Sequence, residues 1–138
     1  MEPYLFLIET KFPSNLFCNV HGVYINPLKY EVKHKGMTVE IRVISVNGIW
    51  GGSYSILTGT WGTSSGVSKR DLAFPTFDSC VEYLWNRIFG YIERNKKDAT
   101  IVENQGSQYV KSEYKKWVSM TTEQKLKLFK QQRGYGKI

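Results

Sequence analysis

The sequence has few of the residues that enzymes and metal proteins use for chemistry. Its 138 residues include only two cysteines, Cys18 and Cys80, and two histidines, His21 and His34. Structural zinc generally needs two closely spaced ligand pairs, and only Cys18 and His21 are close. A cysteine nucleophile needs a neighbouring base, which the spacing does not indicate. We therefore expect no metal, no cofactor and no enzymatic activity, and we interpret both cysteines as reduced.

Long hydrophobic runs are also absent. The longest covers residues 4–8, whereas a membrane-spanning helix needs roughly 20 apolar residues. No basic segment precedes this run, as a secretory signal would require. We expect a cytoplasmic protein without membrane contact. Because 41% of the residues are hydrophobic, the chain can bury enough apolar surface to fold.

The first half of the chain has the pattern of an antiparallel sheet. Apolar and polar residues alternate over residues 28–33 and 37–43, as in strands with one wet face. Asn47-Gly48 then predicts a type I′ hairpin turn, and the returning strand carries Trp50, Tyr54 and Ile56 on one face. Residues 4–8 and 16–25 supply further short strands.

The second half has the period of helices. Ser79 and Glu82 are spaced as a capping box before an apolar stripe that includes Leu84, Trp85 and Ile88. A second helix is expected over about 107–118, and a third follows the box of Thr121 and Gln124. The prediction is an α+β fold: an antiparallel β-meander of four to six strands, then three helices, the first packed on the sheet. We expect a single domain (1–138) that is mainly β over 1–66 and mainly α over 74–132, with a frayed tail at 133–138.

The net charge of +7 lies entirely in the last part of the chain. Residues 1–86 contain seven Lys/Arg and seven Asp/Glu, while residues 87–138 contain twelve Lys/Arg and five Asp/Glu. Several cations on one face release counterions when they neutralise phosphates, which gives affinity without sequence specificity. The asymmetry therefore favours a polyanionic partner.

The candidate partner-binding residues are the cations of the helical half together with two loop residues. Aromatic residues such as Tyr91, Tyr109 and Trp117 lie among them, and exposed rings stack on unpaired bases. We expect RNA ahead of DNA, or a nucleoprotein effector. The residues are Lys69, Arg70, Arg87, Arg94, Lys96, Lys97, Lys111, Lys115, Lys116, Lys125, Lys127, Lys130 and Arg133.

Two other functions remain open. The same lysines would also suit a protein-only module that binds an acidic partner. Glu31 and Lys33 match the Glu-x-Lys element of metal-dependent nucleases, in which His34 or Glu40 would take part, but such enzymes need a further acid to hold Mg²⁺. No Walker loop or dinucleotide fingerprint occurs among the glycines of residues 48–66.

Residues 37–94 resemble a strand-strand-helix module of small phage and plasmid accessory proteins. The resembling features are the strand over 39–46, the Asn47-Gly48-Ile49-Trp50 turn, the Gly-rich run to Ser65 and residues 74–79 that open the helix. The resemblance implies a host-directed protein of a mobile element, for which anti-CRISPR inhibitors are one class of this size. The expected function is therefore a non-enzymatic, nucleic-acid- or ribonucleoprotein-binding inhibitor of a CRISPR-Cas or similar defence nuclease, located in the host cytoplasm if phage-encoded.

Three strands followed by a helix also resemble part of a double-stranded-RNA-binding domain. That family places a lysine-rich motif where the helix begins. Here the corresponding residues are Phe77-Asp78-Ser79-Cys80, so the family's RNA contacts do not transfer to this chain.

Overall fold

The computed structural model describes residues 23, 24 and 26–131. They form an α+β fold in which an antiparallel meander precedes three helices and the first helix packs on the sheet, which confirms the predicted fold class. The predicted strand at 4–8, Cys18, His21, Arg133 and the tail at 133–138 lie outside the described residues. The elements are β1 (Val23–Tyr24), β2 (Leu28–His34), β3 (Met37–Val46), β4 (Ile49–Leu57), β5 (Gly62–Ser64), β6 (Val67–Ser68), η1 (Lys69–Asp71), β7 (Leu72–Phe74), α2 (Phe77–Arg94), η2 (Lys96–Asp98), α3 (Ile101–Val118), α4 (Thr122–Lys127) and β8 (Lys130–Gln131).

The main sheet follows chain order through its centre. Its strands lie in the order β5-β4-β3-β2-β8, all antiparallel, and β7 also pairs with β4. Between β3 and β4, Asn47 and Gly48 have φ angles of 52° and 79°. A type I′ turn needs positive φ at both central positions, so the predicted hairpin is confirmed. Strands β1 and β6 form a separate two-stranded sheet.

A threonine caps the N-terminus of each α-helix. The Oγ1 of Thr76 accepts a hydrogen bond from the Ser79 N–H at 3.0 Å, so α2 begins at Phe77 and the predicted cap at Ser79 was wrong. The buried Phe77 draws this earlier turn into the helix. Thr100 likewise caps α3, well before the predicted start near 107. The box of Thr121 and Gln124 is confirmed.

The missed first turns of α3 have an irregular pattern. Ile101 and Val102 are exposed, whereas Glu103 and Gly106 are buried, the reverse of an amphipathic helix. Gly106 allows α3 to approach the β2–β3 turn, since a Cβ there would lie 2.8 Å from the Met37 Cβ. A tertiary contact therefore determines this part of the helix, and local periodicity does not reveal it.

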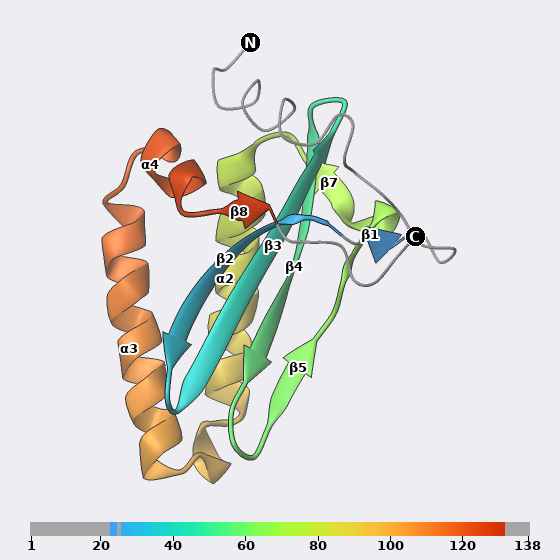
Figure 1. Cartoon of the computed structure of the whole chain (residues 1–138). Helices are drawn as coiled ribbons and strands as arrows, with labels where there is room; N and C mark the ends of the chain where they lie inside the picture. The colour runs from blue at the N-terminus through green and yellow to red at the C-terminus, as the bar shows by residue number, and fades with distance from the viewer. Residues whose placement is uncertain (1–22, 25, 132–138) are drawn as a thin grey trace.

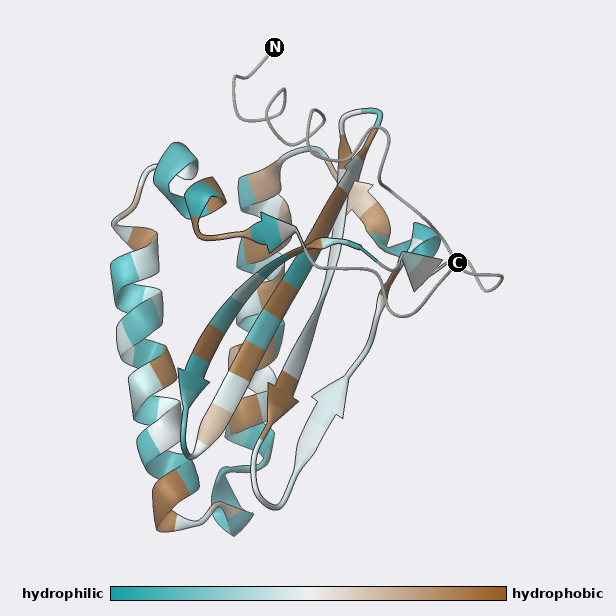
Figure 2. Cartoon of the chain, in the orientation of Figure 1, coloured by the Kyte–Doolittle hydropathy of each residue, from teal (hydrophilic) through white to brown (hydrophobic). Residues whose placement is uncertain are grey.

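The two long helices cover one face of the sheet, and the view in Figure 1 is from the opposite face, with α2 behind the strands. Figure 2 shows hydrophobic and hydrophilic residues alternating along β3, as expected when the helices cover one face of the sheet. Aromatic rings fill the space between the layers: the Tyr30 centroid lies 5.2 Å from that of Trp117 and 5.5 Å from that of Phe129. Full burial of such a side chain contributes roughly 1.5–3 kcal/mol.

In the part of the chain that the structure describes, no helix has the length and apolar content to cross a membrane.

Candidate anion-binding surface

The helical layer presents its cations outward. On α2 and η2, Arg87, Arg94, Lys96 and Lys97 are exposed. Helix α3 adds Lys111, Lys115 and Lys116, of which Lys111 is half-buried. Because side chains that face the sheet are apolar, the charged residues lie on the opposite, solvent side of these helices.

The remaining predicted cations lie toward the start of α2. Lys125 and Lys127 belong to α4, and Lys130 belongs to β8. Lys69 and Arg70 are exposed in η1. The neighbouring Asp71 is close enough to Cys80, in the first turn of α2, to affect its pKa. Helix α2 has 18 residues, so about 27 Å separates this end from Lys96 and Lys97. The structure therefore spreads the predicted residues along the helical layer.

Two of these cations are paired within the protein. The Nζ of Lys116 lies 3.3 Å from an oxygen of Glu113. The Nζ of Lys125 lies 3.5 Å from an oxygen of Asp78 and 5.4 Å from the centroid of the Trp117 ring. Their charges are partly neutralised. Among the described residues, no carboxylate lies within 4.0 Å of the other predicted cations, which are Lys69, Arg70, Arg87, Arg94, Lys96, Lys97, Lys111, Lys115, Lys127 and Lys130.

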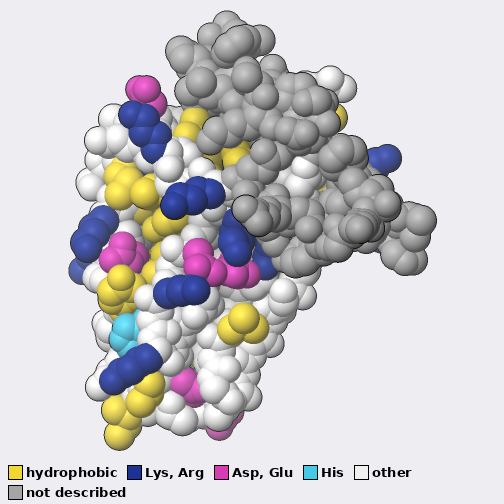
Figure 3. Space-filling view, viewed as in Figure 1, with side chains coloured by type: hydrophobic (Ala, Val, Ile, Leu, Met, Phe, Trp, Pro, Cys, Tyr) yellow, Lys and Arg dark blue, Asp and Glu magenta, His cyan; other side chains and the backbone are white. Residues whose placement is uncertain are grey.

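On the face of the sheet opposite α2 and α3, the charged side chains form ion pairs. The Nη2 of Arg42 donates to Glu40 at 2.6 Å, Lys29 donates to Glu40 at 3.4 Å, and Lys33 lies 3.5 Å from Glu31. In Figure 3, Lys/Arg and Asp/Glu side chains alternate across the middle of this face, over β2 and β3. These contacts offset the repulsion between Glu31 and Glu40, which are directly opposite in the register.

The electrostatics of Glu40 reflect this pairing. Burial alone would raise its pKa, but the positive charges of Arg42 and Lys29 favour the ionised carboxylate, and the pKa is lowered overall. The carboxylates that a nuclease would use are thus held by cations of their own face. Among residues 23, 24 and 26–131, no three His, Cys, Asp or Glu side chains are grouped as ligands for a metal ion.

His34 and Cys80 have structural environments. The Nδ1 of His34 accepts the Gly36 N–H at 3.0 Å within the β2–β3 turn, and its ring lies 5.3 Å from that of Tyr109. Cys80 is fully buried. Burial, together with the charge of Asp71, raises the pKa of its thiol to about 12. A thiol with such a pKa is protonated at neutral pH and is a poor nucleophile.

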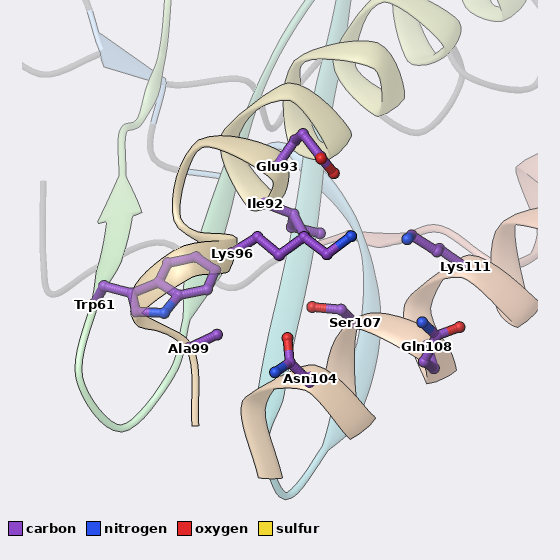
Figure 4. A pocket seen from close by; sticks show the side chains of 9 residues that line it. All are labelled: Trp61, Ile92, Glu93, Lys96, Ala99, Asn104, Ser107, Gln108 and Lys111. Carbon is purple, nitrogen blue, oxygen red and sulfur yellow. The ribbon is translucent and has the colours of Figure 1, made fainter. Parts of the chain in front are cut away.

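A pocket lies where α2, η2 and α3 meet the β4–β5 hairpin. It is a shallow recess that is open to solvent, with an enclosed volume of about 20 Å³. Trp61, Ile92 and Ala99 give it apolar walls, and Lys96 and Lys111 supply two ammonium groups. Figure 4 shows these two lysine side chains extending toward one another from separate elements. The structure thus brings together two predicted cations that are far apart in the sequence.

The hairpin that carries Trp61 is fixed at several points. The Trp61 N–H donates to Thr58 Oγ1 at 2.9 Å, and the Tyr91 hydroxyl donates to the Gly62 carbonyl at 3.0 Å. Thr60 Oγ1 donates to Glu103 Oε2 at 2.7 Å, which ties the hairpin to α3. Hydrogen bonds from Thr100 and Thr60 lower the pKa of Glu103 to about 2.

Sequence reasoning missed several residues of this pocket. Glu93, Asn104, Ser107 and Gln108 complete its lining, and all four are ordinary residues for a helix surface. Trp61 stands in a run rich in Gly, Ser and Thr, where a large aromatic residue is unusual. That contrast was the one signal in the sequence for a site here.

Comparison with protein-family models, with curated proteins and with solved structures finds no match for this chain.

Proposed function

We propose that this chain is a non-enzymatic binding protein that engages a nucleic acid or a nucleoprotein through its helical layer. The observation that carries the proposal is the contrast between its two faces. The sheet-face cations Lys29, Lys33 and Arg42 are paired with carboxylates, whereas Arg87, Arg94 and other helical cations have no carboxylate within 4.0 Å among the described residues. Unpaired exposed cations are free to exchange their counterions for phosphates.

Exposed rings on the same layer support a nucleic acid with unpaired bases. Tyr83 on α2 is 47% exposed and Tyr109 on α3 is 39% exposed. Arg94 lies 5.5 Å from the centroid of the Tyr91 ring. Stacking of a base on an aromatic side chain is sequence-tolerant and contributes about 1–3 kcal/mol per base. This favours single-stranded RNA over duplex DNA.

The biological setting in this proposal is inhibition of a host CRISPR-Cas or similar defence nuclease by a mobile element. A nucleic-acid-loaded effector presents the polyanion that the helical layer would contact. The resemblance of residues 37–94 to phage and plasmid accessory proteins supports this setting. Identifying the proteins and nucleic acids that co-purify with the tagged chain would test it.

The experiment for the central proposal is a salt titration with labelled RNA and DNA, each single- and double-stranded. If five phosphates are contacted, log K should fall with log salt with a slope of about −3.5 for single strands. Fluorescence anisotropy measures this directly. Absence of binding to all four probes at low salt would overturn direct nucleic-acid contact.

One observation favours a protein-only module as a second candidate. Ile101 is 79% exposed and Val102 is 41% exposed at the start of α3, and Tyr109, about two helical turns further along, is 39% exposed. Apolar side chains of this kind are typical of protein contacts. An acidic protein bound by the lysines would then account for the charge, and it would co-purify after nuclease treatment.

A further inference from the structure

The pocket formed by Trp61, Lys96 and Lys111 has an electrostatic imbalance. Its two ammonium groups come from η2 and α3, and Figure 4 shows them extending toward each other. Glu93 is the single carboxylate in the lining, and it forms no ion pair within 4.0 Å with a described Lys or Arg. Two cations that converge without a counterion repel each other, so an anion between them would be stabilised by both.

The remaining walls suit an aromatic ring rather than a bare ion. Trp61 is the least buried of the four tryptophans: Trp50 and Trp85 are 0% exposed and Trp117 is 2% exposed, whereas Trp61 is half-buried. Its ring packs 5.7 Å from that of Tyr91, and Ile92 and Ala99 extend the apolar wall. The hydrogen bonds from Thr60 and Tyr91 hold the hairpin in this position.

Hydrogen-bonding groups occupy the α3 side of the pocket. The amides of Asn104 and Gln108 each offer two donors and an acceptor. The indole Nε1 of Trp61 is buried and has no hydrogen-bond partner. The enclosed volume is only about 20 Å³, far below that of a closed small-molecule site, so a ligand would lie across the open mouth of the recess rather than inside it. Together these features match a ligand with a negative charge at one end and a polar ring at the other.

We propose that this pocket is a nucleotide-binding site, in which Lys96 and Lys111 hold the phosphate and Trp61 contacts the base. Two ammonium groups make charge-assisted hydrogen bonds to phosphate oxygens, and a base stacks on an indole whatever its identity. The side-chain amides of Asn104 and Gln108 line the same pocket and offer hydrogen-bond donors and acceptors to the nucleotide. The nucleotide would be either the terminal unit of a bound strand or a free mononucleotide. The first case rests on the proposed function, which it deepens.

Intrinsic tryptophan fluorescence provides the test. Since three of the four indoles are buried, a ligand in the pocket should quench Trp61 selectively, and Trp61→Phe should abolish the change. The probes are adenosine monophosphate, adenosine, inorganic phosphate and a short single-stranded RNA with or without a 5′-phosphate. We expect the monophosphate to quench and to bind at least about tenfold more tightly than adenosine, which lacks the charge.

Matched lysine variants separate the pocket from the surface around it. Lys96→Gln and Lys111→Gln should each weaken the monophosphate about tenfold or more. Lys35→Gln removes an exposed charge of the β2–β3 turn that neither lines the pocket nor belongs to the candidate binding residues, so it should have little effect. Equal losses in all three variants, or equal binding of adenosine and its monophosphate, would overturn the site. Circular dichroism of each variant checks that the fold is retained.

The RNA probes distinguish the two possible sources of the nucleotide and the two proposals. Tighter binding of the 5′-phosphorylated RNA would assign the pocket to strand ends, whereas quenching by the monophosphate with no effect of the 5′-phosphate would assign it to free nucleotides. RNA binding without any monophosphate quenching would overturn the pocket and leave the polyanion surface standing. Monophosphate binding without RNA binding would support the pocket and overturn the polyanion surface.

Discussion

Glu103 links the two parts of the pocket wall. Its carboxylate accepts the Thr100 N–H at 2.9 Å, which completes the cap of α3, and it also accepts the Thr60 N–H at 3.1 Å. One side chain thus positions both the helix that carries Lys111 and the hairpin that carries Trp61. Glu103 is only 3% exposed to solvent, which is unusual for a glutamate.

The hydrogen bonds to Glu103 predict a pH dependence of stability. Because its pKa in the folded protein is about 2, below the ordinary 4.5, its contribution is complete above the unfolded pKa and is lost as the pH falls from 4.5 toward 2. Glu103→Gln should be less stable than the wild type at neutral pH, and the difference should shrink across this window. Urea unfolding followed by circular dichroism measures it.

Glu93→Gln is the control for that experiment. Glu93 is exposed and forms no ion pair within 4.0 Å with any described cation, so its removal should leave the pH dependence nearly unchanged. If the wild type and Glu103→Gln lose stability in parallel between about pH 5 and about pH 2, the carboxylate does not carry the assigned role.

At the scale of elements, the approach of α3 to the sheet depends on small residues. A Cβ on Gly106 would lie 2.8 Å from the Met37 Cβ and 2.9 Å from the Gly36 carbonyl carbon. A glycine is therefore required at this crossing, although it lowers helix propensity. Tyr114 adds a link between the helices, since its hydroxyl donates to Glu82 at 2.5 Å.

Two glycine-to-alanine variants should change stability in opposite directions. On α2, Gly90 has space, since the nearest atom to a Cβ would be an Arg94 guanidinium nitrogen at 3.8 Å. Gly90→Ala should stabilise the protein by up to about 1 kcal/mol. Gly106→Ala gains the same propensity but forces α3 away from Met37, so the net effect should be destabilising. Urea unfolding gives both values.

Equal stabilisation by both alanines would contradict the close packing of α3 on the β2–β3 turn. A destabilising Gly90→Ala would instead contradict the open space beside Gly90 on α2. Because each variant serves as the other's control, the pair tests the position of both helices.

Two features that the sequence predicted correctly depend only on neighbouring residues. The Asn47-Gly48 turn needs positive φ at two adjacent positions, and the box of Thr121 and Gln124 joins residues of one turn, so both were found. The start of α3 was missed because its first turns are shaped by Thr60 and Met37, which are distant in the sequence. The pocket was missed for the same reason: Trp61 and Lys111 meet only after the chain has folded.

At the scale of the whole molecule, the two faces differ in whether their cations are paired with carboxylates, and not only in how many cations they hold. The sheet face holds three cations around Glu31 and Glu40, and these groups largely neutralise one another. The helical layer holds cations that lack carboxylate neighbours among the described residues. The pairing was not visible in the sequence, because it depends on the cross-strand register of β2 and β3.

The most direct measurement compares two variants that each remove two exposed cations. Arg87→Gln/Lys115→Gln alters the helical layer, and Lys33→Gln/Lys35→Gln alters the β2–β3 turn. With single-stranded RNA, the helical variant should bind more weakly and its salt slope should be smaller by about 1.4, while the turn variant should behave as the wild type. An equal loss in both variants, or no loss in either, would contradict a binding surface on the helical layer.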